Sequence, residues 1–504
     1  MGFSIRFSRT RNNRTDDVME FTLRNTNIKR KRIMKNRYIL YTVIFLMGLP
    51  GYAQNQTENK YSLDECISIA LANNLDLKST NLTANSAKVD YQRSKANMLP
   101  SINGNFNLGV NDGRSIDPFT NDFINQELTF SNAGLSLDVT IFNGFRLLNT
   151  AKQNRLNKKA SDQEIEANKQ DLILSVTLVY LQVLNARDVL ELTKARLKTT
   201  QEQLKIQEGF YENESGNPAD YADILGQVSS DETSILVSES SLNNAKLNLI
   251  RLLNIEDSVT LDTEGLILDF EKYGLSADAV YKEALQHLAT FKARELRIEA
   301  AKKGVSVAKS QFTPEIALFG GINTNYSSAA QLFNSTGTSV VETGDFVTVG
   351  GQDLQVMTEQ TAFAAERISF RDQLDNNLNT VVGVVVNVPL FNGFRAKNNV
   401  ALEKIRVQES VLELERTHID IKNAISQVHF DMEAVYKRHQ SLERQVLAYQ
   451  ESYRINDIRF KNGVSNFLNY ITSKNNLDNA KVNLANAKYE YLLRVKVLDY
   501  YRGT

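Results

Sequence analysis

The sequence predicts a mainly α-helical protein with membrane β-strands added: long antiparallel coiled-coil helical hairpins, and four strands that cross a membrane. Three observations support this fold class. One segment, Phe-Asn-Gly-Phe-Arg at the end of an apolar strand, lies within 140–146 and recurs 249 residues later within 389–395. Four segments alternate apolar and polar side chains, as a strand with one apolar face does. After each copy of the repeated segment, apolar residues recur every seven positions, which is typical of a coiled coil.

The first 53 residues are expected to be an over-long start followed by a signal peptide. Six basic residues between 29 and 37 precede a mostly apolar run at 38–49, and the small residues Gly51 and Ala53 follow. The run is too short to span a bilayer, which favours a cleaved export signal over an inner-membrane anchor. Such a signal could begin at Met34. The exported chain carries one cysteine, Cys66, so no intramolecular disulfide can form.

Composition favours long helices and argues against an enzyme. The 504 residues include six prolines and no tryptophan, and the net charge of -1 comes from interspersed acidic and basic residues. A nucleic-acid partner would require a basic patch, so none is expected. Phosphate-loop, dinucleotide-binding and zinc-protease motifs are missing from the sequence, and we expect no enzyme activity and no cofactor. His418 falls on the heptad pattern, which predicts a packing role rather than a metal site.

The four strands are expected at about 101–111, 133–142, 315–326 and 381–391. Ile102, Phe106 and Leu108 alternate with asparagines, and the third and fourth strands repeat the first and second at offsets of 214 and 249 residues. Transmembrane barrel strands have this pattern, with apolar side chains towards lipid and polar ones towards a wet lumen. Four strands cannot close a barrel, and open edges are not tolerated in hydrocarbon. Several chains must therefore share one barrel.

Two structural repeats are expected, at 54–274 and 275–504. Each begins with a helical stretch, 63–97 or 276–311, that closes at Pro100 or Pro314. The second strand pair encloses a longer linker within 327–379, rich in Ser, Thr, Gly and Gln, which we interpret as an external loop.

A long helix is expected behind each repeated segment. The first runs from Gly144 to about Glu208, on the order of 100 Å, which is too long for a compact domain. Breaks at 214–218 and 461–465 precede return helices that end near Asn254 and Tyr500. Each repeat is therefore predicted to end in a long antiparallel helical hairpin.

The strand-to-helix corners are expected to need residues that tolerate a positive φ. Asn143 and Gly144 in the first repeat, and Asn392 and Gly393 in the second, meet this need. The corner arginines lie where the helix dipole disfavours a cation. We therefore expect partner carboxylates or lipid headgroups near the two corner arginines, Arg146 and Arg395.

With these features combined, the chain resembles the TolC-like outer-membrane efflux factors from about Tyr61 to Gly503. The resemblance implies a homotrimer in which each chain contributes four strands to a twelve-stranded barrel, with a periplasmic tunnel of α-helices. It implies passive conduction across the outer membrane of a Gram-negative bacterium. A periplasmic adaptor protein and an inner-membrane pump would be the partners, together with outer-membrane lipid.

The resemblance also assigns candidate site residues. The adaptor is expected to contact the helical turns, which here are Ser215, Gly216 and Asn217, and Gly463, Val464 and Ser465. Gly216 is expected to be the counterpart of Gly463, 247 residues later. The tunnel is expected to be constricted just beyond them. Well-known members carry aspartates six and nine residues after the second turn's glycine, whereas Asn469 and Thr472 stand there in this chain. The other candidates are Asp223, the nearby Asp220, and the aromatic Phe460. Asp220 and Asp223 could instead cap the return helix.

A surface-displayed trimeric coiled-coil adhesin is the alternative function, because it would share the heptads and the export signal. It would have a parallel, unbroken stalk and no need for duplicated membrane strands. Drug, metal and protein export use the same kind of conduit, so the sequence leaves the substrate open.

Overall fold

The computed structural model describes residues 60–116, 121–125, 127–256, 260–261 and 270–503. The described residues from Tyr61 onward belong to one structural unit. The expected export signal in 1–53 lies outside the described residues. The boundary between the two repeats at 274 and 275 stays a prediction.

The first repeat contains two short helices, a strand pair and a long helical hairpin. Its elements are β1 (Lys60–Tyr61), α2 (Leu63–Asn73), α3 (Leu75–Ala96), β2 (Ser101–Asn111), β3 (Arg114–Ile116), β4 (Phe123–Asn125), β5 (Leu128–Phe142), α4 (Arg146–Glu212), α5 (Pro218–Leu253) and β6 (Thr260–Leu261).

The second repeat has the same plan, with a long insertion between its strands. Its elements are α6 (Ala277–His287), α7 (Ala289–Lys309), the 3-10 turn η1 (Ser310–Phe312), β7 (Glu315–Ser327), β8 (Gln331–Val349), β9 (Gln352–Arg367), α8 (Phe370–Asn376), β10 (Asn379–Asn387), α9 (Arg395–Lys461) and α10 (Phe467–Arg502). The helical stretch expected to be continuous in each repeat is divided in two. In the first repeat the division is at Asn74, whose Oδ1 accepts a hydrogen bond from Leu77 N at 3.0 Å and starts a new helix.

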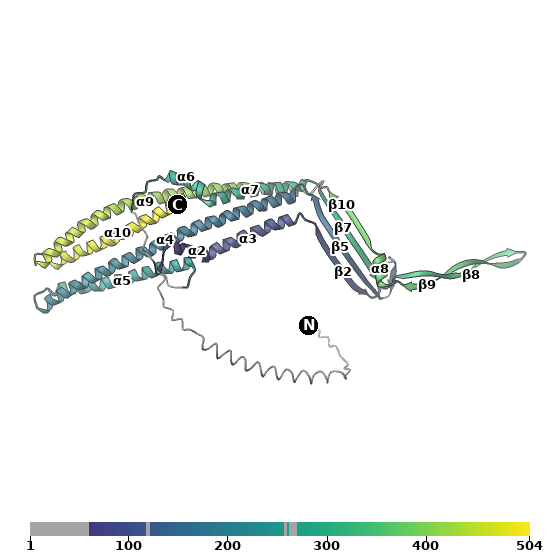
Figure 1. Ribbon diagram of the computed structural model, residues 1–504, viewed down its shortest axis with the longest axis horizontal. Coiled ribbons are helices and arrows are strands. Elements are labelled where there is room, and N and C mark those ends of the chain that lie inside the picture. Colours follow the sequence, from purple (N-terminus) through teal and green to yellow (C-terminus); the bar gives the residue numbers. More distant parts are fainter. Residues whose placement is uncertain (1–59, 117–120, 126, 257–259, 262–269, 504) are drawn as a thin grey trace, which may run out of the picture. The chain divides into compact units, whose positions relative to one another are not determined.

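Strands β2, β5, β7 and β10 lie side by side in one antiparallel sheet, in the order β10-β7-β5-β2 (Figure 1). One face carries apolar side chains that are largely exposed, such as Ile102 at 69% and Phe106 at 65%. The other face carries a row of asparagines across three strands, with Asn107 opposite Asn132 and Asn132 opposite Asn325. Both faces therefore follow the alternation in the sequence.

Strand β10 is shorter than expected. It ends at Asn387, although the alternation continues to Leu390 and the strand was expected to reach residue 391. Pro389 has no backbone N–H to donate to a ladder, so pairing stops ahead of it.

The segment expected as an external loop, 327–379, forms strands β8 and β9 and the short helix α8. β8 and β9 pair with each other as an antiparallel hairpin whose side chains are almost all exposed. Helix α8 is fastened to the end of β7 by the buried Gln373, whose amide accepts from Ser327 N at 2.9 Å and donates to Ser327 O at 3.0 Å.

The heptad positions of the long helices contribute to the core. Val176, Val183 and Leu190 of α4, and Ile425 and Met432 of α9, are buried. Helix α4 also contains a segment long and apolar enough to cross a membrane by length and composition alone. Leu172, Val176 and Leu184 of this helix belong to a core cluster shared with α2, α5 and α10, so part of this apolar surface is buried within the chain.

His418 has the packing role that its heptad position predicts. Its ring stacks on Phe291 with centroids 4.7 Å apart, and its Nδ1 lies 3.1 Å from the hydroxyl of Tyr281.

Candidate functional site

The two helical turns are the same structure built twice. α4 and α9 are each 67 residues long, and α5 and α10 are each 36. In the first turn Ser215 N donates to Phe210 O at 3.0 Å, and in the second Val464 N donates to Arg459 O at 2.8 Å. The offset of 249 residues therefore holds through both turns.

This equivalence corrects the expected alignment of the turn glycines. The counterpart of Gly463, at φ 73°, is Glu214, at φ 50°, and not Gly216. Gly216 instead packs against Phe210, because a Cβ placed on it would lie 2.9 Å from that residue's Cβ. The sequence suggested the wrong pairing because glycine is the usual residue at a positive φ, and a glutamate occupies this position in the first turn.

The residues expected to contact an adaptor lie at the end of each hairpin. Ser215, Gly216 and Asn217 follow α4 directly, with Asn217 as the N-cap of α5, where its Oδ1 accepts from Ala219 N at 3.1 Å. Gly463 and Val464 are exposed, Val464 to 66%, and Ser465 is partly exposed. Both turns are therefore accessible in the single chain.

The expected constriction residues occupy matching positions on the two return helices. Asp220 and Asp223 of α5 correspond to Asn469 and Thr472 of α10 at the offset of 249. The acids do not form the N-cap, which is Asn217, but Asp220 lies in the first turn and accepts from Asn217 Nδ2 at 3.3 Å. Partial burial and the neighbouring Asp223 raise the pKa of the Asp220 carboxyl.

Phe460 packs between helices. Its ring stacks on Tyr470 with centroids 5.1 Å apart, within an apolar cluster that also contains Ile224 of α5. The counterpart pair in the first hairpin, Tyr211 and Tyr221, stacks at 4.8 Å. An aromatic pair thus packs across each hairpin beside its turn, a contact that the sequence pattern did not predict.

A buried polar cluster joins the two hairpins farther from the turns. Asp231 of α5 and Lys474 of α10 are 0% and 2% exposed. Thr200 of α4 donates to Asp231 at 2.5 Å and accepts from Lys474 Nζ at 3.0 Å. Arg196 Nε lies 2.8 Å from Asp231 Oδ1, an ion pair not aligned as a hydrogen bond, and Lys474 also pairs with Asp478 at 2.9 Å.

The sequence contains a signal for this cluster in the comparison of its two repeats. At the offset of 249, Asp231 corresponds to Ala480 and Lys474 to Leu225. When one repeat has a charged residue and the other has an apolar residue at the equivalent position, the charged residue indicates a contact that only its own repeat makes.

At the corners, the positive φ falls on glycine and the following phenylalanine. Gly144 and Phe145 have φ of 63° and 61°, and Gly393 and Phe394 both have φ of 61°. The expectation that asparagine also supplies this conformation was wrong: Asn143 is buried, and its Oδ1 accepts from Leu147 N at 3.3 Å. Asn392 likewise has no positive φ.

The corner arginines have different partners. Arg146 pairs with Glu315 of β7 at 3.0 Å, as expected of a partner carboxylate. Arg395 donates from Nε to Asn392 O at 3.1 Å, within its own turn.

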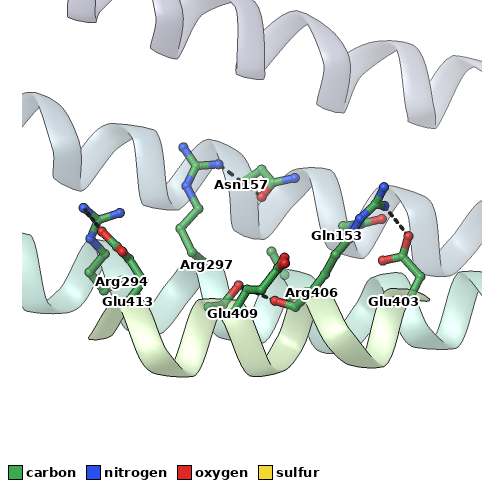
Figure 2. Close-up of a pocket in the computed structure, with 11 residues that line it drawn as sticks. Gln153, Asn157, Arg294, Arg297, Glu403, Arg406, Glu409 and Glu413 are labelled. Atoms are coloured by element: carbon green, nitrogen blue, oxygen red, sulfur yellow. Dashed lines mark hydrogen bonds and ion pairs between the residues drawn. The ribbon is translucent and has the colours of Figure 1, made fainter. Parts of the chain in front are cut away.

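A charged groove of about 600 Å³ lies between α4, α7 and α9 (Figure 2). Its three arginines are already paired: Arg294 with Glu413 at 3.1 Å, Arg297 with Glu164 at 2.9 Å, and Arg406 with Glu403. The groove therefore has no evident excess of charge for a ligand. No group of three or more His, Cys, Asp or Glu in the described parts of the chain could hold a metal ion.

Comparison with known proteins agrees with this architecture. The family model described as outer membrane efflux protein matches residues 66–254 and 353–504. The toxin and drug export protein A of Aggregatibacter actinomycetemcomitans is 22% identical over 437 residues, 85% of this chain and 83% of that protein. The outer membrane protein TolC of Vibrio cholerae is 23% identical over 415 residues, 82% of this chain and 83% of that protein.

The same fold occurs in solved structures. A crystal structure of CusC superposes with a TM-score of 0.70 at 18% identity, covering 88% of this chain and 92% of that chain. The resemblance to TolC-like proteins is thereby confirmed. Because the family model matches well over half of its length, the chain belongs to the outer membrane efflux protein family and is an outer-membrane protein.

Proposed function

We propose that three copies of this chain form a passive export channel, in which each copy gives β2, β5, β7 and β10 to a closed twelve-stranded barrel. The observation that carries the proposal is the four-stranded sheet, whose edges β2 and β10 have no partner strand within the described residues. Open edges cannot persist in hydrocarbon. Copies joined head to tail around an axis would remove every edge.

The sheet has the length and the surface that a membrane requires. β2, β5, β7 and β10 have 11, 15, 13 and 9 residues, and a tilted membrane strand needs about 9 to 11. Exposed apolar side chains such as Val384, at 62%, would face lipid, and the asparagine row would face a wet lumen.

The helices would continue the channel into the periplasm. In this proposal an adaptor protein contacts the exposed turns around Ser215 and Gly463, and an inner-membrane pump delivers the substrate. The relatives are named for toxin, drug and cation export, so this chain is proposed to conduct whatever its pump supplies. The chain has no catalytic role in this proposal.

The constriction is proposed at the start of the return helices. Asp220 and Asp223 occupy the positions in α5 that Asn469 and Thr472 occupy in α10, so only the first hairpin would place carboxylates at the closed tip. Phe460 would support the tip through its stack on Tyr470 rather than line the opening.

The adhesin alternative is not favoured. Its stalk would be parallel and unbroken, whereas α4 turns at 213–217 into α5, which packs back against it.

The test is the mass of the protein extracted in detergent from outer membranes, by native mass spectrometry or light scattering. About three mature chains, resistant to mild SDS, would support the shared barrel. A soluble monomer recovered from the periplasm would refute the channel.

A further inference from the structure

The two repeats share one strand register. In the first repeat Ile102 of β2 stands opposite Leu137 of β5. At the sequence offsets of 214 and 249 residues this pair becomes Ile316 and Val386, and those two residues stand opposite each other in β7 and β10. A contact in one repeat can therefore be transferred to its counterpart in the other.

The pairing that joins the repeats has no counterpart within the described part of the chain. β5 of the first repeat pairs with β7 of the second, with Leu135 opposite Ile322. The counterpart of β5 is β10 and that of β7 is β2, and these strands are the two edges of the sheet. The internal repeat thus specifies a strand pair that a single chain cannot form.

The second corner shows the same incompleteness. A Cβ on Gly144 would lie 1.8 Å from Thr313 Oγ1, because the second repeat covers the first corner. Nothing lies within 4 Å of a Cβ on Gly393. Phe391 beside it is 79% exposed, whereas its counterpart Phe142 is partly buried. The second corner therefore lacks the cover that the first corner has.

We propose that a second copy of this chain supplies the missing strand and the missing cover, in the register that the internal repeat sets. The inference rests on the proposed trimer and adds its residue contacts. Transferring the pair Leu135 and Ile322 by the two offsets places Val384 of one copy opposite Leu108 of the next.

The same sequence offsets identify the residue that would pack over the second corner, at Gly393. Thr313 lies over Gly144, and at the offset of 214 the counterpart of Thr313 is Leu99. Leu99 of the next copy therefore covers Gly393. Leu99 is 68% exposed in the single chain, so it is available for this contact.

This register pairs apolar side chains on one face of the sheet. Val382 meets Val110, Val384 meets Leu108 and Val386 meets Phe106, all of them more than half exposed in the single chain. The other face is mixed, with Asn387 opposite Asn105 and Val385 opposite Asn107. A shift of one residue would break the apolar match and place Val384 or Val386 opposite an asparagine, because side chains alternate between the faces of a strand.

One contact between the repeats is not repeated between copies. The counterparts of Arg146 and Glu315 are Arg395 and Ser101, so the ion pair at the first corner has no equivalent across the interface. The interface between copies is thus held by strand pairing and apolar contact rather than by this charge pair.

Cysteine cross-linking in outer membranes tests the register. The pairs Leu108→Cys with Val384→Cys, and Asn107→Cys with Val385→Cys, lie in the proposed register on opposite faces. Leu108→Cys with Val386→Cys is the matched control, shifted by two residues on the same face. Membranes are oxidised with copper phenanthroline, boiled in SDS to dissociate any non-covalent trimer, and analysed by SDS electrophoresis without reductant. Wild type, which carries only the buried Cys66, is the blank.

We expect at least one in-register pair to give covalent dimers and trimers that reductant dissolves, while the shifted control and the wild type stay monomeric on the gel. Equal cross-linking of the shifted control would overturn the register. A trimeric mass in detergent with neither in-register pair linked would overturn it as well, while leaving the channel in place. A monomeric mass would overturn the proposed trimer and this inference together.

Discussion

Replacing Asp231 by asparagine tests whether the buried polar cluster holds the two helical hairpins together. The carboxylate is fully buried and accepts hydrogen bonds from Thr200 at 2.5 Å and Gln227 at 2.8 Å, in addition to its ion pair with Arg196. Asparagine keeps the shape of the side chain and removes its charge. Arg196 and the buried Lys474 are then left with one acid fewer.

The expected loss of stability follows from the burial. Removing one partner of a buried ion pair costs about 3 to 5 kcal/mol, because the remaining charge is left uncompensated. With an unfolding entropy of about 2 cal/mol/K per residue, roughly 440 ordered residues correspond to about 0.9 kcal/mol/K. The melting temperature of the Asp231→Asn variant should therefore fall by about 3 to 6 °C.

Circular dichroism of the detergent-solubilised protein during heating measures this change. The control is Glu451→Gln, which removes an exposed carboxylate of α9 that pairs with Arg454 at 2.7 Å. We expect the control to melt like wild type, because exposed ion pairs are screened by water. If Asp231→Asn also melts like wild type, the cluster does not hold the hairpins and the reasoning from burial fails.

Three further predictions concern the corners and the tip. Gly144→Ala should lower the free energy of unfolding of the unassembled chain more than Gly393→Ala does. Each alanine costs about 1 to 2 kcal/mol because the backbone φ is positive. Only the alanine at 144 also clashes with a neighbouring side chain, which costs about 1 to 3 kcal/mol more. Equal melting temperatures of the two unassembled variants would contradict this. Asn469→Asp should lower the resting K⁺ conductance in planar bilayers by strengthening the closed tip, and an unchanged single-channel conductance would count against placing Asn469 there. Asp220→Asn should be slightly more stable than wild type at neutral pH, by less than about 1 kcal/mol at this largely solvated site. Because the folded state raises the pKa of the Asp220 carboxyl, the protonated carboxyl stabilises wild type at low pH. Wild type loses this stabilisation as the pH rises from the ordinary carboxyl pKa through the raised pKa. Melting curves between pH 4 and pH 7 measure the difference, and parallel curves would refute it.

Local sequence patterns predicted much of the fold. The alternation around Ile102 and Leu135 indicated membrane-type strands, and the heptad spacing around Val176 and Ile425 indicated long packed helices, because both periods depend only on which side of an element is buried. The hairpin of β8 and β9 was missed for the same reason. Its side chains are exposed on both faces, so burial leaves no period in its sequence.

The candidate site was predicted less completely. The turns and the residues beyond them were placed in the right region, but Gly216 was matched to Gly463 although Glu214 takes that position. The role of Phe460 depended on Tyr470, which stacks on it from the other side of the turn. Sequence spacing locates a turn, whereas a ring stack depends on how two helices face each other.

The amino-acid sequence by itself determined the duplicated plan, its alternating strands and its helical hairpins, since each follows from short-range periodicity and from a segment used twice. Only the tertiary structure decided that Asp231 and Lys474, 243 residues apart, share a buried cluster. It also decided that β2 and β10 form the two edges of the sheet within the described residues. Such contacts depend on how distant elements pack, and the cost of burying a charge or leaving an edge unpaired arises only once they have packed.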